Sequence, residues 1–113
     1  MSDIRGADAD DILAERLRAL GHPARIAIVR TLAEQDCCCG EVCRKVPAAQ
    51  STVSQHLKVL RDAGLLTYSK SGTRSCYGLD RSAFAELERD VAAIVSLVRA
   101  APDACRTEED FAL

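Results

Sequence analysis

The sequence has no long apolar run, because charged residues interrupt every hydrophobic stretch in its 113 residues. A helix that crosses a membrane needs roughly 20 consecutive apolar residues, so no membrane contact is expected. The start, Met-Ser-Asp-Ile-Arg, carries an acid where a secretory signal would carry a basic start and an apolar stretch. These absences predict a cytoplasmic protein.

Internal repeats, linkers and low-complexity segments are also missing, so nothing in the composition divides the chain. The sequence is 48% apolar, which is enough for one modest hydrophobic core, and it is too short for two ordinary domains. We expect one domain over residues 10–101, with flexible ends at residues 1–9 and 102–113.

The net charge of −2 argues against nucleic-acid binding until the charges are placed along the chain. Residues 1–43 hold five basic and eight acidic side chains, residues 44–81 hold seven and two, and residues 82–113 hold three and seven. The middle segment therefore carries a local excess of positive charge. Such a segment can hold a phosphate backbone on an acidic protein, because screening makes the local field matter more than the total. An ordinary solvated face fits the charge pattern equally well.

Capping residues and helical periodicity predict short helices in the first part of the chain. A first helix is capped by Asp10 or Asp11 and ends at Gly21, and a second begins with Pro23 at its first position. A third helix is expected over Cys38–Val46, with Cys38 at the N-cap position.

A fourth helix is predicted over Ser51–Ala63, since Val53, Leu57 and Leu60 recur at helical spacing and Gly64 stops it. Its other face carries uncharged hydrogen-bonding side chains with one histidine and one lysine. That is the set of groups that contacts base edges and phosphates. The candidate DNA-contacting residues of this helix are Gln50, Ser51, Thr52, Ser54, Gln55, His56 and Lys58.

The pattern after Gly64 changes to two short β runs, residues 65–68 and 75–77, which predict a β-hairpin. Lys70 and Arg74 flank its turn, so the tip of the hairpin could reach a phosphate backbone.

The longest helix is expected to start at Asp80 or Ser82. Its apolar residues recur at steps of three and four, and one thin core is too small to cover them all. We interpret them as a dimer interface, with packing inside one subunit as the alternative. The residues are Phe84, Leu87, Val91, Ile94 and Val98.

Two helices joined by a tight turn and followed by a basic hairpin make a winged helix-turn-helix. Here the sequence closely resembles the ArsR/SmtB family of bacterial metal-sensing repressors. The matching stretches are Leu20–Arg25, Ser51–Leu60 and Arg61–Leu66, and the resemblance covers roughly Leu13–Leu79. It implies a mainly α fold with a small β-hairpin wing, and a homodimer formed through the first and last helices.

The resemblance further implies that the fourth helices of the dimer enter successive major grooves of a partly palindromic, double-stranded operator DNA. The wing would then lie at the flanking backbone. For Ser54 and His56, a supporting hydrogen bond inside the helix-turn-helix is an alternative to a base contact.

Four of the six cysteines fall within Cys37–Cys43, directly before the predicted DNA-reading helix. Cys39 and Cys43 are four residues apart and would share one helical face, with Cys37 and Cys38 at or before the cap. A helix N-terminus favours thiolate, which is the form that binds soft metals. Three converging thiolates suit a small thiophilic ion. Cys76 is expected to pack in the wing, and Cys105 is either a free thiol or a ligand supplied across the dimer.

Family members that sense arsenite and antimonite carry Cys-Val-Cys-Asp-Leu-Cys on the corresponding helix. The alignment places Cys38 and Cys43 on the outer cysteines and Gly40 on the middle one, so Cys39 or Cys37 would have to supply the third sulfur. The resemblance thus implies a site of Cys38, Cys39 and Cys43, with Cys37 as a fourth or substitute ligand. Cys39 as a buried core residue is the alternative.

As(III) or Sb(III) is the expected inducer, and four thiolates could also hold Cd(II) or Pb(II). Zinc is less expected, because the family's zinc sensors use histidines of the last helix and no histidine follows His56. We therefore expect a repressor that metal binding releases from DNA. The main alternative is the same repressor responding to oxidants or persulfides through these cysteines. A thiol enzyme is disfavoured, since the chain has no Cys-x-x-Cys before a helix and no phosphate-binding glycine loop.

Overall fold

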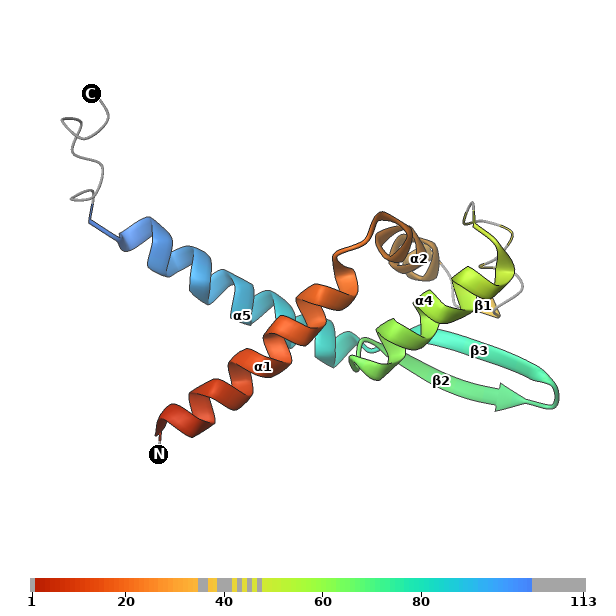
Figure 1. The fold of residues 1–113 in the computed structure, drawn as a ribbon, viewed down its shortest axis with the longest axis horizontal. Coiled ribbons are helices and arrows are strands. Elements are labelled where there is room, and N and C mark those ends of the chain that lie inside the picture. The colour runs from red at the N-terminus through yellow and green to blue at the C-terminus, as the bar shows by residue number, and fades with distance from the viewer. Residues whose placement is uncertain are drawn as a thin grey trace, which may run out of the picture.

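The computed structural model describes residues 2–34, 37, 38, 42, 44, 46 and 48–102, and the backbone alone of residues 2–7, 37 and 38. Helices and the three strands of an antiparallel sheet, in the order β1-β3-β2, make up this part of the chain (Figure 1). In sequence the elements are α1 (Ser2–Leu20), α2 (Pro23–Glu34), β1 (Cys37–Cys38), α4 (Gln50–Asp62), β2 (Leu66–Ser71), β3 (Arg74–Leu79) and α5 (Arg81–Ala100). The prediction of a mainly α fold with a hairpin wing is confirmed.

Helix α1 begins at Ser2, so the predicted start at Asp10 or Asp11 is wrong. Those two residues are suitable N-caps, but nothing before them stops a helix. Residues 2–9 contain no proline and only one glycine, Gly6, which costs about 1 kcal/mol relative to alanine in a helix.

The hydrophobic core lies where α4 packs on α2 and on the sheet. Val53, Leu57 and Leu60 of α4 are 0% exposed, as is Ile28 of α2. Complete burial of such a side chain stabilises the fold by about 1.5–3 kcal/mol. Helix α4 lies within one residue of its predicted ends, and Gly64 follows it with a φ of 83°, the left-handed conformation that commonly ends helices.

Strands β2 and β3 form the wing, and their register pairs Ser71 with Arg74. The loop therefore consists of Gly72 and Thr73. Gly72 has a φ of 64°, whereas Thr73 does not have a positive φ. A positive φ at the first loop residue alone is the signature of a type II′ turn, whose twist matches the twist of the flanking strands.

Strand β1 is a feature that the sequence interpretation missed. Cys38 was expected at the start of a helix, whereas the structure places it in a strand that pairs with β3. Residues 39–41, where the predicted helix would begin, lie outside the described residues. Val42 and Arg44 are helical, and the Val46 N–H donates to the Val42 carbonyl at 2.9 Å. These contacts agree with the later part of the predicted helix.

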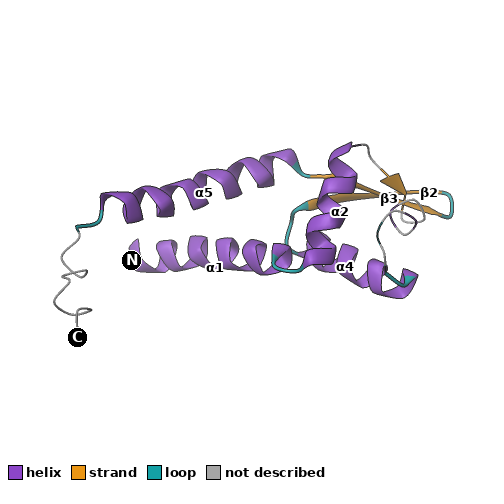
Figure 2. Ribbon diagram, turned by 90° about the horizontal axis from the view of Figure 1, so that it is seen from above, coloured by secondary structure: helices purple, strands orange, loops and turns teal. Residues whose placement is uncertain are grey.

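Helix α5 starts as expected, because the Asp80 carboxylate accepts hydrogen bonds from the Ala83 N–H and the Ser82 hydroxyl, both at 3.1 Å. These hydrogen bonds lower the pKa of Asp80, the bond from Ala83 having the largest effect. In Figure 2, α1 and α5 extend from the core on one side and the wing extends on the other. The candidate DNA-binding elements and the candidate dimerisation helices thus occupy opposite ends of the molecule.

Candidate nucleic-acid interface and thiol site

Helix α4 presents a polar face to solvent because its apolar face is fully buried. Six of the seven predicted contact residues on this helix are exposed, and the hydrogen-bonding side chains among them face away from the core. The N-terminal end of α4 and the tip of the wing lie at the same end of the molecule in both views (Figures 1 and 2). The exposed residues are Gln50, Ser51, Thr52, Ser54, Gln55 and Lys58.

His56 differs from the other six, since it is only 8% exposed. Its ring lies 4.5 Å from the ring of His22, centroid to centroid, and its Nδ1 accepts a hydrogen bond from the Arg25 Nε at 3.1 Å. This geometry fits the supporting role inside the helix-turn-helix and does not fit a base contact. The burial of His56 could have been predicted from the sequence, because His56 follows Val53 by three residues and therefore lies on the same, buried side of the helix.

Burial lowers the pKa of His56, and the nearby His22 and Arg25 lower it further. The Ala24 N–H donates to His22 Nδ1 at 3.0 Å, so the His22 side chain caps α2 directly before Pro23. His56 accepts through Nδ1, which suits the neutral form of its ring. The sequence interpretation missed this pair, although a histidine before a helix-starting proline is a recognisable cap position.

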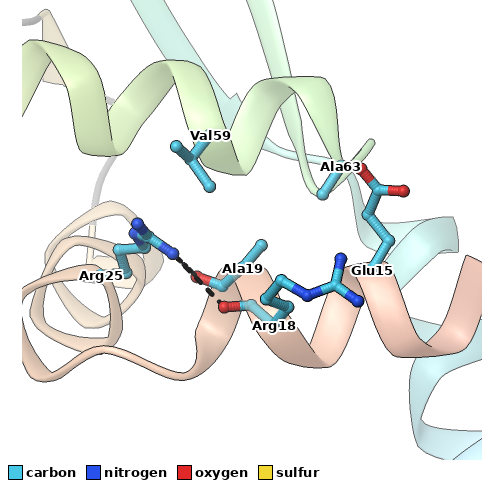
Figure 3. A pocket seen from close by; sticks show the side chains of 6 residues that line it. All are labelled: Glu15, Arg18, Ala19, Arg25, Val59 and Ala63. Carbon is cyan, nitrogen blue, oxygen red and sulfur yellow. Dashed lines mark hydrogen bonds between the residues drawn. The ribbon is translucent and has the colours of Figure 1, made fainter.

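Arg25 connects α1 with α4. Its Nη1 donates to the carbonyl oxygens of Arg18 and Ala19, at 3.3 and 3.4 Å (Figure 3). Its Nε donates to His56 Nδ1. The two carbonyls belong to the last turn of α1, where a cation is favourable because the helix dipole is negative there. Figure 3 shows Arg25 and Val59 on the wall of a shallow pocket between these helices.

The Lys58 ammonium lies 2.9 Å from an Asp62 carboxylate oxygen, and both side chains are more than half exposed. The hydrogen bond from Lys58 lowers the pKa of Asp62. Such an exposed pair contributes little stability, so a phosphate can replace the carboxylate at small cost. Arg61, the last residue but one of α4, lies over the ring of Tyr68 with its Cζ 4.9 Å from the centroid, a contact that links the wing to α4.

The wing carries its two predicted cations near the tip. Lys70 pairs with Ser75 in the register, Arg74 pairs with Ser71, and both cationic side chains are exposed. The wing tip, which carries them, lies at the same end of the molecule as the N-terminal end of α4, and this agrees with a role at the DNA backbone beside a major groove.

Cys37 and Cys38 form β1, where Cys37 pairs with Tyr77 and Cys38 pairs with Cys76. Cys39, Cys43 and Cys105 lie outside the described residues, so the convergence of Cys38, Cys39 and Cys43 stays a prediction. Among the residues that the structure describes, no three histidine, cysteine or acidic side chains gather into a metal-binding group.

Part of the predicted apolar seam of α5 packs inside the subunit and part does not. Leu87 is buried and Phe84 and Val91 are half-buried, whereas the C-terminal half of the helix exposes its apolar side chains. The Arg16 guanidinium binds the Glu86 carboxylate at 3.0 Å and joins α1 to α5. The exposed apolar residues of the two helices, named here the α1–α5 patch, are Ile12, Leu17, Ile94, Val95, Leu97 and Val98.

None of the helices in the described part of the chain is long and apolar enough to cross a membrane.

Comparisons with known proteins agree with this geometry. Residues 22–68 match the family model described as "Bacterial regulatory protein, arsR family". The chain is 41% identical over 83 residues to the HTH-type transcriptional repressor SmtB of Mycobacterium tuberculosis, a match that covers 74% of the chain and 62% of that repressor.

Two solved structures share the fold. One is described as a possible transcriptional regulator for arsenical resistance, and it is 30% identical to this chain with a TM-score of 0.66. The match covers 78% of this chain and 97% of the chain of that structure. The other is the homodimeric winged helix-turn-helix domain of Mb0332 from Mycobacterium bovis, which is 25% identical to this chain with a TM-score of 0.68. The match covers 82% of this chain and 86% of the chain of that structure.

Proposed function

Because the chain belongs to the ArsR/SmtB family of bacterial transcriptional regulators, we propose that it is a homodimeric repressor whose release from operator DNA is triggered by a thiophilic ion. The observation that carries this proposal is the face of α4, which is polar and exposed at the same end of the molecule as the wing cations. Members of the family are DNA-binding regulators rather than enzymes, so the alternative of a thiol enzyme is set aside.

Two kinds of DNA contact follow from the exposed side chains. Lys58, Lys70 and Arg74 bind phosphates, which gives affinity for any sequence. Gln55 and its exposed neighbours on α4 contact base edges in the major groove, which gives preference for the operator. His56 takes no part in reading the bases and instead holds α4 in place through Arg25.

Dimerisation uses the α1–α5 patch. Six apolar side chains that are each more than 40% exposed on two neighbouring helices are unusual for the surface of a small monomer. The homodimeric relative from Mycobacterium bovis, which has the same fold, supports this assignment. A second copy of the chain would bury the patch and present two α4 helices to two half-sites.

The inducer is As(III) or Sb(III), bound by Cys38, Cys39 and Cys43 with Cys37 as a fourth or substitute ligand. Cd(II) or Pb(II) would use all four thiolates, and zinc remains less favoured. The donor chemistry fits, since thiolate sulfur is the ligand that these soft ions prefer, and β1 stands directly before the segment that leads into α4. An ion bound there lowers operator affinity to the extent that it binds the DNA-free form more tightly.

The alternative inducer is an oxidant or a persulfide that acts on the same thiols. A single set of titrations separates the two proposals. Fluorescence anisotropy on DNA upstream of the protein's own gene would be measured with phosphine-reduced protein, and arsenite, cadmium, lead, zinc and peroxide would be added in turn. We expect arsenite to release the DNA and a small dithiol to restore binding.

The matched variant is Cys43→Ser, which should bind DNA normally and lose the arsenite response. If arsenite left operator binding unchanged, or if Cys43→Ser responded like the unchanged protein, the metalloid mechanism would be wrong. Failure of the dimer to bind any DNA would overturn the repressor proposal itself.

A further inference from the structure

The register of the small sheet brings together two cysteines that are far apart in sequence. Cys38 of β1 and Cys76 of β3 are direct partners in the antiparallel ladder. Residues that face each other in such a ladder have Cα atoms about 4.5–5.5 Å apart and carry their Cβ atoms on the same face of the sheet. The adjacent pair, Cys37 and Tyr77, belongs to the opposite face, because successive residues of a strand alternate.

The face that carries Cys76 is the outer face of the wing. Tyr68 and Tyr77 lie on the other face, where Arg61 of α4 covers the ring of Tyr68. Across the sheet Cys76 also pairs with Ser69, which is exposed, and Cys76 itself is half-buried. The register thus places Cys38, Cys76 and Ser69 in one row across the sheet, at positions of the face turned away from α4.

We propose that Cys38 and Cys76 form a two-thiolate site that binds a thiophilic ion between β1 and the wing. Cβ atoms of opposed residues in a ladder lie about 4.5–5.5 Å apart, at or beyond the roughly 3.5–4.5 Å that is usual for a disulfide. Two metal–sulfur bonds of about 2.3 Å span a wider gap than one sulfur–sulfur bond of about 2.05 Å. The register therefore favours an ion over a direct disulfide as the bridge.

With arsenite the reaction involves no change of oxidation state. Each of two As–O bonds of arsenous acid breaks, each thiol forms an As–S bond in its place, and each thiol proton leaves in a water molecule. The product is one arsenic that keeps one hydroxyl and joins the two cysteine sulfurs. No oxidant or reductant is needed.

This site deepens the proposed function, because it rests on the same class of inducer and adds Cys76 to the candidate ligands. It also gives the ion a second point of action. An ion held by Cys38 and Cys76 fastens the segment before α4 to a strand of the wing, so both DNA-binding elements are constrained by one bound ligand.

The first test uses the unchanged protein. Reduced protein is treated with iodoacetamide with and without arsenite, and alkylation of the peptide containing Cys76 is followed by mass spectrometry. At an arsenite concentration tenfold above its Kd, about one site in eleven is vacant, so alkylation of Cys76 should slow about tenfold. Unchanged alkylation of Cys76, with arsenite still releasing DNA, would overturn this proposal and leave the proposed function standing.

The second test isolates the pair. A variant with serine at the other four cysteines keeps only Cys38 and Cys76, and native mass spectrometry should find one arsenic bound with loss of two thiol protons. Adding Cys76→Ser to that variant should weaken arsenite binding roughly tenfold or more, because the second sulfur then no longer binds from within the molecule.

The matched control keeps Cys37 and Cys76 in place of Cys38 and Cys76, since Cys37 belongs to the other face of the sheet. Circular dichroism checks that all three variants keep their helices. Equal arsenite affinity in the Cys38/Cys76 and Cys37/Cys76 variants would contradict a site defined by the register.

Discussion

The wing cations should set a measurable part of the salt dependence of DNA binding. The perturbation is the double variant Lys70→Ala, Arg74→Ala, which removes two exposed cations at the tip of the wing. In the proposed dimer four phosphate contacts are lost. Each contact contributes about 0.9 to the slope of log affinity against log salt, so the slope should become shallower by about 3.6.

The assay is fluorescence anisotropy on operator DNA at salt concentrations from 50 to 200 mM. Over this fourfold rise in salt, the factor by which affinity falls should be about 150 times smaller for the double variant than for the unchanged protein. The loss of affinity at low salt should be the same for operator and for unrelated DNA, because phosphates carry no sequence information.

A matched control is Arg99→Ala, which removes an exposed cation in the last turn of α5, at the end of the molecule opposite the wing. Its slope should equal that of the unchanged protein. If the double variant also kept the original slope, the wing would not contact phosphates and the proposed orientation on DNA would be refuted.

Three further predictions concern α4, its support and the dimer. Gln55→Ala should keep the salt slope and reduce preference for the operator over altered sites, by about 1–3 kcal/mol per lost bidentate contact, in competition binding assays. The lowered pKa of His56 favours the neutral ring in the folded state, so its contribution to stability is present above the ordinary value of 6.5 and is lost as pH falls through and below it. Urea unfolding at pH 7.5 and 5.5 should show this loss, and the fall should be smaller in His56→Gln; an equal fall would contradict it. The double variant Leu97→Asp, Val98→Asp should sediment as a monomer and keep its helical circular dichroism signal. The reason is that these side chains are 72% and 68% exposed in one subunit, so they are not needed for its fold. If the variant remained a dimer, the interface would lie elsewhere.

The elements that sequence predicts well are those with a local signal. Val53, Leu57 and Leu60 repeat at helical spacing and Gly64 follows them, so both ends of α4 were predicted within one residue. The hairpin likewise depends on neighbouring residues around Gly72. In each case the determining contacts lie within a few turns or one short loop.

The features that sequence did not predict depend on contacts between distant segments. Strand β1 has two residues and no periodicity of its own, and it forms only by pairing with β3, where Cys38 lies opposite Cys76 in the register. The environment of His56 depends on Arg25 of α2 and on the cap residue His22. The start of α1 was wrong for a different reason, since two good capping residues inside a helix resemble a helix start.

The contact of Arg25 with both α1 and α4 has a consequence for operator choice. One guanidinium donates to two carbonyls in the last turn of α1, a candidate dimerisation helix, and to the His56 ring of α4, the candidate DNA-reading helix. In the proposed dimer, the separation between the two DNA-reading helices therefore depends on a contact inside each subunit as well as on the interface. In that dimer, tolerance for operators with different half-site spacing depends in part on Arg25, a residue outside both the α1–α5 patch and the exposed face of α4.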